Sequence, residues 1–198
     1  MIRTGILHVP ETDANASEEL RGILRRLGAI VVLEEARPSN RNWIADTLRR
    51  WSDEEEIDLI LTVGGTLPAP GPSAEECVPE ATLEVLDRLA PALPETMRAE
   101  VGIDQPLALL DRGVAGIRSR TLIVNLPEGD AAALFLVNIA EVIPAYVAHL
   151  QANTSAPRLG GLVGGSESDD AVEKSPSETR TGLDPQEFAA FLQRPKQT

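Results

Sequence analysis

Short apolar runs alternate with helix-like segments along about the first 150 residues, and this alternation limits the possible folds more than any other feature of the chain. Each run is apolar on both faces, as are the strands of a parallel sheet that is covered on both sides. Alternation of strand and helix is typical of α/β proteins. The sequence therefore predicts an α/β fold with a mostly parallel sheet, whose strands are expected at Thr4–Val9, 29–35, 58–63 and 121–127.

Helices are predicted between these strands from apolar residues at helical spacing. The first follows Ser17, which is expected to be its N-cap, and two glutamates occupy its first turn. Gly28 is expected to end it, because glycine readily adopts the conformation found after a helix. The other helices are predicted over 39–52, over 79–89, around Met97 and over 131–150.

The composition decides what kind of core and what kind of partner the chain can have. Aromatic residues make up 3% of the sequence against 42% for all hydrophobic residues, so the core is predicted to be aliphatic. The net charge is −13, which argues against a nucleic-acid or anionic-membrane partner because no contiguous basic patch is available. An anionic small molecule is still allowed, since a few backbone N–H groups and one arginine can hold it.

Cys77 is the only cysteine, so the chain cannot form an intramolecular disulfide, and a reducing compartment is predicted. The N-terminus has no long apolar region, and no stretch reaches the length of a membrane span. These features predict a cytoplasmic protein. Cys77 itself has no histidine nearby in the sequence, which favours an inert, half-buried thiol over a nucleophile.

The sequence changes character after residue 152, which predicts an α/β domain over 1–152 and a mostly disordered tail over 153–198. The tail is rich in glycine, serine and charged residues and has few large apolar ones, so it cannot offset the entropy of ordering. A short amphipathic helix is predicted at 184–194, where Phe188 and Phe191 belong to an apolar stripe. Two interpretations stay open for it: a fraying terminal helix, or a segment that docks on a partner protein.

A glycine-rich loop, Gly64, Gly65 and Thr66, directly follows the strand predicted at 58–63. In doubly wound sheets, ligands bind outside the carboxyl ends of the strands. Glycine allows close approach of a ligand to the backbone, and free N–H groups there can cradle an anion. The alternative is a tight turn without a ligand, which this short motif by itself fits at least as well.

Three arginines, Arg112, Arg118 and Arg120, lie close together before the strand predicted at 121–127. The chain is short of positive charge, so their concentration indicates a site for an anion. The alternative is ordinary ion pairing with the many surface carboxylates.

Three segments in this order, DLILTVGGT (58–66), VPEATLEVLDR (78–88) and RGVAGIRSRTLIVNLP (112–127), resemble the molybdopterin-binding domain family of the MogA and MoaB type. The resemblance covers residues 4 to about 150, and the last segment is its most specific part. It implies a three-layer α/β/α sandwich, usually a homotrimer. It also implies a site at the strand ends where molybdopterin is adenylylated by ATP with Mg²⁺.

The resemblance assigns roles to individual positions of this sequence. Glu11 and Glu76 stand where the family has aspartates, so they are the implied catalytic residues and Mg²⁺ ligands. The implied ligand-binding residues are Gly64, Gly65, Thr66, Arg112, Asn125, Pro127 and Gly129.

Several positions depart from the family pattern. Leu67 replaces a glycine, Pro10 and Glu11 replace a Ser-Asp pair before a shortened loop, and Asp111 replaces a serine. Glu128 and Asp130 put negative charge where the family has a small-residue loop facing its anionic ligand. Two such charges near a phosphate in a partly dehydrated site cost on the order of a few kcal/mol. The alternative role for them is to stabilise the start of the following helix.

Two functions follow from these observations. The first is a molybdenum cofactor biosynthesis protein that binds molybdopterin and adenylylates it. The second is a non-catalytic assembly or regulatory subunit that keeps the fold and recruits a partner protein through its tail helix. The retained carboxylates favour the first function, and the shortened loop after Glu11 and the acidic segment 128–130 favour the second. The altered loops at 10–17, 67–78 and 128–130 leave the catalytic activity open.

Overall fold

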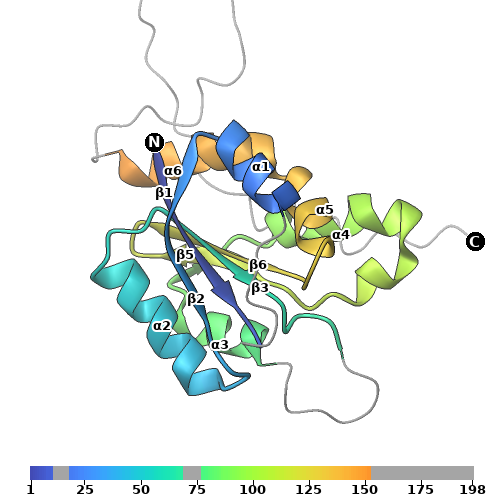
Figure 1. The fold of residues 1–198 in the computed structure, drawn as a ribbon, viewed down its shortest axis with the longest axis horizontal. Coiled ribbons are helices and arrows are strands. Elements are labelled where there is room, and N and C mark those ends of the chain that lie inside the picture. Colours follow the sequence, from blue (N-terminus) through green and yellow to red (C-terminus); the bar gives the residue numbers. More distant parts are fainter. Residues whose placement is uncertain (11–17, 69–76, 153–198) are drawn as a thin grey trace, which may run out of the picture. The chain divides into compact units, whose positions relative to one another are not determined.

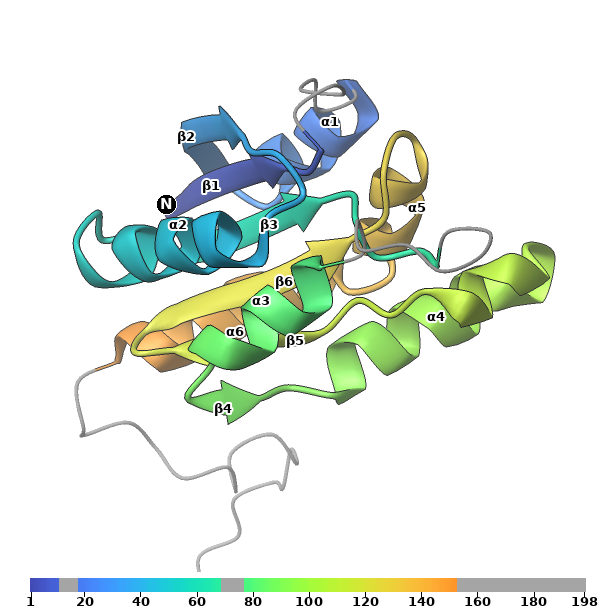
Figure 2. The same cartoon turned by 90° about the horizontal axis from the view of Figure 1, so that it is seen from below.

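The computed structural model of the chain describes residues 1–10, 18–68 and 77–152, and the strands in these ranges form one six-stranded sheet (Figure 1). The strand order is β2-β1-β3-β6-β5-β4, and β2 and β4 lie at opposite edges, as Figure 2 shows. The strands are β1 (Ile2–His8), β2 (Ala29–Ala36), β3 (Leu59–Val63), β4 (Arg88–Leu89), β5 (Ala115–Arg118) and β6 (Thr121–Leu126).

The sheet is parallel across its first four strands, because β1 pairs in parallel with both β2 and β3, and β3 pairs in parallel with β6. Every residue of the two central strands β3 and β6 is buried. This burial explains their apolar sequences, since a central parallel strand is covered on both faces. The predicted α/β fold with a mostly parallel sheet is confirmed.

Helices cover both faces of the sheet and give the three layers that the resemblance implied (Figures 1 and 2). One face carries α1 (Glu18–Arg26), α4 (Ala92–Asp104), α5 (Ala131–Val137) and α6 (Ile143–Gln151). The other carries α2 (Arg41–Asp53) and α3 (Val78–Val85). Two short 3₁₀ helices, Pro106–Leu110 and Ala140–Val142, complete the described elements. The buried clusters on both faces are largely aliphatic, as the composition predicts.

Three details of the predicted elements are wrong. The helix predicted at 79–89 ends at Val85, and the chain continues into β4, which pairs antiparallel with β5. Neither of these two short strands was predicted, because four and two residues are too few for a periodic pattern. The helix predicted at 131–150 is interrupted after Val137, where the Asn138 amide donates to Leu134 O and a 3₁₀ turn leads into α6.

Among the described residues, no single helix has the length and hydropathy of a membrane span. Only α5 taken together with Ala140–Gln151 meets both criteria, as a pair bent by 55°.

Strand β1 and helix α2 are in close contact where the side chain of Trp51 packs against the sheet. The indole of Trp51 is fully buried against Gly5 of β1. A Cβ atom added at Gly5 would lie 2.7 Å from Cε3 and Cζ3 of that ring. The position therefore has no room for a side chain.

The buried side chain of Asn125 in β6 joins four segments of the fold. Its Nδ2 donates to Thr62 Oγ1 of β3 and to Thr82 Oγ1 of α3, both at 2.9 Å. Its Oδ1 accepts from the N–H of Val114, just before β5, at 3.2 Å. All hydrogen-bonding groups of this amide side chain are thus in use within the protein, where an unpaired group would be costly.

We predict that Gly5→Ala lowers the free energy of unfolding by about 1–3 kcal/mol, because the new methyl group overpacks the contact with Trp51. Gly22→Ala is the matched control, since a Cβ atom there would meet only two arginine side-chain ends at 3.9 Å. It lies inside α1 and should raise the stability by about 0.5–1 kcal/mol. Urea unfolding of both variants measures the difference, and equal stabilities would contradict the packing argument.

We predict that Asn125→Ala destabilises the fold by about 2–4 kcal/mol, because it leaves two buried threonine hydroxyls and one partly buried N–H group without this partner. Asn138→Ala should cost less than about 0.5 kcal/mol, because that exposed side chain makes one hydrogen bond at the surface. Chemical denaturation of the two variants compares them. A small loss for Asn125→Ala would show that the network can be rebuilt around water.

Candidate functional site

Three chain segments meet at the carboxyl ends of the parallel strands. The loop Gly64–Thr66 leaves β3, residues 127–130 leave β6, and Asp111–Gly113 precede β5. Because β5 runs antiparallel to β6, the beginning of β5 lies beside the end of β6. We call this group of segments the strand-end site.

Gly64 and Gly65 both have positive φ angles, +97° and +65°, which other residues rarely adopt. A Cβ atom on Gly64 would lie 1.9 Å from Val9 O, and one on Gly65 would lie 2.7 Å from Val78 Cγ2. The N–H of Gly64 donates to Leu126 O at 2.9 Å. Tight packing against the rest of the protein is therefore enough to explain both glycines. This agrees with the alternative interpretation of the loop as a tight turn.

The next two residues differ in exposure, because Gly65 is partly exposed whereas Thr66 is fully buried. Within the described residues, the N–H groups of Gly65 and Thr66 make no hydrogen bond. They follow two consecutive residues with positive φ, a backbone arrangement that can turn neighbouring N–H groups toward an anion. Gly65 therefore offers a ligand one partly exposed N–H donor that has no partner among the described residues.

Arg112 is the one member of the predicted arginine cluster that reaches the strand-end site. Its N–H donates to Thr66 O at 2.9 Å, and its guanidinium pairs with Glu80 in the first turn of α3. Arg118 and Arg120 lie at the far end of the β5–β6 hairpin. Arg118 binds Asp53 through two nitrogens, and Arg120 donates to a main-chain carbonyl of α6. For these two residues, the alternative of structural pairing holds.

Asp111, which stands at the family's serine position, is buried with only 4% of its surface exposed. Its Oδ2 accepts the N–H of Gly113 at 3.0 Å and lies 3.8 Å from Arg98 Nη1. Its Oδ1 and the neighbouring Thr66 Oγ1 are both buried, and neither completes a hydrogen bond. Burial raises the pKa of Asp111, although the Thr66 hydroxyl, the Gly113 N–H and the Arg98 charge oppose this rise.

Two charged residues that the sequence analysis did not single out help to build the site. Arg98 of α4 donates to Gly113 O at 2.9 Å and so holds the segment before β5. Glu80 pairs with Arg112. Glu80 stands within a segment that carries the family resemblance, so that segment offered a signal for it. The sequence held no such signal for Arg98, because a single arginine in a predicted helix has no special meaning by itself. Its role depends on the fold, which brings α4 next to the site.

The remaining predicted residues occupy different places. Asn125 lies at the site, but all hydrogen-bonding groups of its side-chain amide take part in the network described above. A ligand could bind this amide only if one of those hydrogen bonds broke. Pro127 is buried and Gly129 is exposed. Glu128 lies close to Gly64, because a Cβ atom on that glycine would be 3.7 Å from Glu128 Cβ. Asp130 occupies the N-cap position of α5, but its side chain makes no capping hydrogen bond.

The residues predicted for catalysis and for Mg²⁺, Glu11 and Glu76, lie outside the described residues. Within the described ranges, no group of three or more His, Cys, Asp or Glu side chains is arranged to hold a metal ion. Burial raises the pKa of the Cys77 thiol, which agrees with its interpretation as an inert group.

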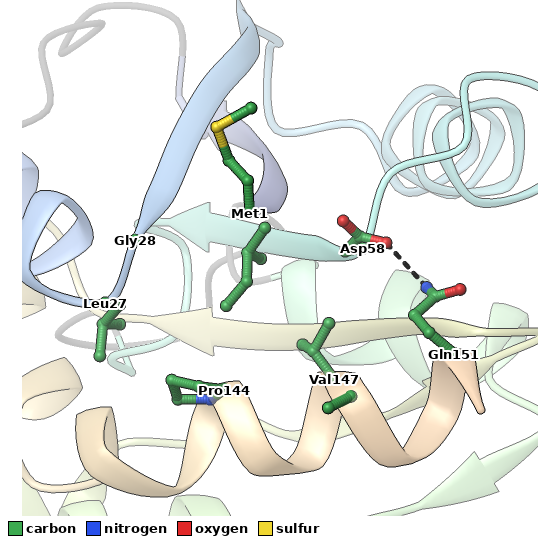
Figure 3. Close-up of a pocket in the computed structure, with 9 residues that line it drawn as sticks. Met1, Leu27, Gly28, Asp58, Pro144, Val147 and Gln151 are labelled. Atoms are coloured by element: carbon green, nitrogen blue, oxygen red, sulfur yellow. Dashed lines mark hydrogen bonds between the residues drawn. The ribbon is translucent and has the colours of Figure 1, made fainter.

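A large cavity lies at the amino ends of the parallel strands, between the start of β1, the end of α1 and α6 (Figure 3). Its volume is about 710 Å³, and its lining includes Leu27, Pro144 and Val147. The polar side chains there are paired with protein atoms, since Gln151 Nε2 donates to Asp58 Oδ1 at 2.7 Å and Asp58 Oδ2 accepts the N–H of Arg3. Size alone therefore does not mark this cavity as the functional site.

Comparison with known proteins places the chain beside molybdenum cofactor proteins. No family model matches the sequence. The molybdopterin adenylyltransferase of Helicobacter pylori is 40% identical over 87 residues, which is 44% of this chain and 47% of that enzyme. The chain spans less than half the length of the curated relatives it matches.

Solved structures match over a greater share of their length. The molybdopterin biosynthesis enzyme MoaB of Thermus thermophilus is 39% identical, with a TM-score of 0.68, and the match covers 76% of this chain and 96% of that protein. The molybdopterin biosynthesis Mog protein of Mycobacterium ulcerans is 26% identical, with a TM-score of 0.66 and coverage of 76% and 99%. The chain belongs to the molybdopterin-binding protein family of the MogA and MoaB type.

Proposed function

We propose that this protein binds molybdopterin at the strand-end site and acts in molybdenum cofactor biosynthesis as a molybdopterin adenylyltransferase. The observation that carries the proposal is the partly exposed N–H group of Gly65, which makes no hydrogen bond within the described residues, in a loop that Arg112 contacts and in a chain of this family. One backbone donor and one guanidinium are a suitable environment for a phosphate group. The relatives named adenylyltransferases support the choice of ligand.

Binding of an anionic ligand here has an electrostatic cost that the chain itself imposes. Arg112 is already paired with Glu80, so a phosphate would have to share or replace that carboxylate. Glu128 and Asp130, both exposed on the loop after β6, add negative charge close to the Gly64 backbone. We therefore expect weaker binding than in a relative with a small-residue loop, and tighter binding in the variant Glu128→Gly with Asp130→Pro.

The adenylyl transfer itself would take AMP from ATP, attach it to molybdopterin and release pyrophosphate. ATP and Mg²⁺ enter this proposal through the resemblance, and the adenylyl transfer through the names of relatives. When bound, Mg²⁺ would neutralise charge on the reacting phosphates. Glu11 and Glu76 stay the proposed residues for holding it.

Nothing among the described residues or the comparisons favours the alternative of a non-catalytic assembly subunit. A cytoplasmic location also stays a prediction, as does the docking of the tail helix on a partner protein. Incubation of the protein with molybdopterin, ATP and Mg²⁺ tests the catalytic part directly. Adenylylated molybdopterin and pyrophosphate are the expected products, and binding without either product would restrict the proposal to ligand binding.

We predict that Arg112→Gln weakens molybdopterin binding about tenfold, because one charge-assisted contact to the phosphate is lost. Arg120→Gln is the control: it changes the same residue type in the same chain segment, but at the far end of the β5–β6 hairpin. It should leave the affinity unchanged. Calorimetric titration measures both affinities, and thermal melts correct them for the folded fraction.

A different pattern would place the ligand elsewhere. Equal losses in the two variants would mean that the arginines act through general charge or folding. A loss confined to Arg120→Gln would move the site to the amino ends of the parallel strands, where Arg120 lines a pocket together with Arg3 and Asp58.

Self-association is the second part of the proposal, with a homotrimer as the expected state. Four large apolar side chains are exposed at the end of α4 and in the 3₁₀ helix that follows it, and their exposed fractions lie between 55% and 75%. They are Ile103, Leu107, Leu109 and Leu110, which we call the leucine patch. Patches of this kind on a soluble protein commonly mark interaction surfaces, and this one directly precedes Asp111 in the chain.

We predict that Leu107→Glu combined with Leu109→Glu reduces the mass in light scattering to that of the monomer, 21.2 kDa. Burying a carboxylate in an apolar interface is unfavourable. Leu134→Glu, an equivalent change on the exposed side of α5, should leave the assembly intact. A wild-type protein that is already monomeric would refute self-association.

A further inference from the structure

The chain segment that carries Arg112 is held by the side chain of Arg98 in α4. Arg98 Nη1 donates to Gly113 O at 2.9 Å and to Asp111 O at 3.4 Å, and it lies 3.8 Å from Asp111 Oδ2. Asp111 and Gly113 are the two neighbours of Arg112 in the chain. Arg98 therefore contacts both the residue before Arg112 and the residue after it.

These contacts come from a charged donor in a place that water reaches only in part. The side chain of Arg98 is 23% exposed. A hydrogen bond from a charged donor contributes more than one between two neutral groups. Two carbonyls and one carboxylate of one short segment meet the same guanidinium, so α4 restrains this segment at both ends.

Other contacts leave the main chain of this segment little freedom. The N–H of Arg112 donates to Thr66 O at 2.9 Å, and the N–H of Gly113 donates to Asp111 Oδ2 at 3.0 Å. A Cβ atom on Gly113 would lie 2.8 Å from Asp111 Oδ2 and 3.2 Å from Asn125 O. The main chain here is closely packed, whereas the side chain of Arg112 is 43% exposed and open to a ligand.

Arg98 and the guanidinium of Arg112 belong to different faces of the sheet. Arg112 pairs with Glu80 of α3, whereas Arg98 comes from α4, and α3 and α4 pack on opposite faces. Arg98 therefore need not touch a ligand that Arg112 binds. Any effect of Arg98 on such a ligand would pass through the main chain of Asp111 and Gly113.

We propose that Arg98 is a positioning residue for ligand binding, which holds the main chain on both sides of Arg112 and so keeps the Arg112 guanidinium in place for an anion. A loop that is ordered before binding avoids the entropy cost of becoming ordered on binding. Loss of the Arg98 contacts therefore lowers the affinity without removing a group that touches the ligand. The inference rests on the anion site of the proposed function and adds to it a residue outside the ligand contacts.

The first test is a double-mutant cycle with Arg112. Arg98→Met keeps much of the length of the side chain and removes its donors, so the molybdopterin affinity in calorimetric titration should fall about tenfold. In the Arg112→Gln background the same change should cost less than about twofold, because the group that Arg98 positions is gone. Equal losses in both backgrounds would overturn the inference, since Arg98 would then act independently of Arg112.

Two further variants separate positioning from charge. Arg98→Lys keeps the charge and can still donate to one carbonyl, so it should bind within about threefold of the wild type. Arg49→Met is the control, because it removes an arginine of α2 whose partners, Asp46 and Glu84, are exposed on the other face of the sheet. It should leave the affinity unchanged. A loss in Arg49→Met as large as that in Arg98→Met would overturn the inference, because net charge would explain both.

Amide hydrogen exchange tests the restraint without a ligand. In Arg98→Met, the N–H of Arg112 should exchange about tenfold faster, because its bond to Thr66 O opens more often. The N–H of Val9, which donates to Val63 O at the same end of the sheet, should exchange as in the wild type. Equal acceleration at both amides would show a general loss of stability and overturn the inference, as would an unchanged rate at Arg112.

The results also separate the inference from the proposed function. Absence of molybdopterin binding by the wild-type protein would refute the proposed function, and with it any role of Arg98 in binding. Wild-type binding that Arg98→Met leaves unchanged would overturn the inference alone and leave the proposed function standing.

Discussion

The strand-end site depends on the buried amide of Asn125, because that side chain ties together the elements on which the site is built. Its hydrogen bonds reach β3, α3 and the residue before β5, and so fix three segments around the end of β6. The two bonds to the threonines are shielded from water, where an unmade bond costs more than a made bond gains. The family resemblance implied a ligand contact for this residue, whereas its geometry describes a support for the loops that would make such contacts.

On this support the chain places the loop Gly64–Thr66, which we propose as an anion cradle. Gly64 uses its N–H to extend the pairing between β3 and β6, and the N–H of the partly exposed Gly65 has no partner among the described residues. The cradle is held in place from behind by Arg112, whose N–H binds Thr66 O, and by the packing of Gly65 against Val78. The same glycines thus serve a tight turn and leave a donor for a ligand, so the two interpretations of this loop are compatible.

The charges around the cradle distinguish this chain from the family pattern. Carboxylates stand at positions 111, 128 and 130, at different depths. The exposed pair acts through solvent and is screened by salt, whereas Asp111 acts through the protein interior, where screening is weak. Burial raises the pKa of Asp111, because the ionised form is poorly solvated there.

The sequence by itself determined the class of the fold and marked the loop after β3 as a candidate site. The apolar pattern of β3 and β6 predicts strands covered on both faces, and glycines after β3 mark the carboxyl edge, because both signals are local. Only the tertiary structure separated Arg112 from Arg118 and Arg120. The short antiparallel strand β5 lies between them, so that Arg112 lies at the carboxyl ends of the parallel strands and the other two lie at the amino ends. The tertiary structure also brought Arg98 to Gly113 and enclosed Asp111, because burial and long-range contacts depend on how α4 and the loops pack, which no local pattern records.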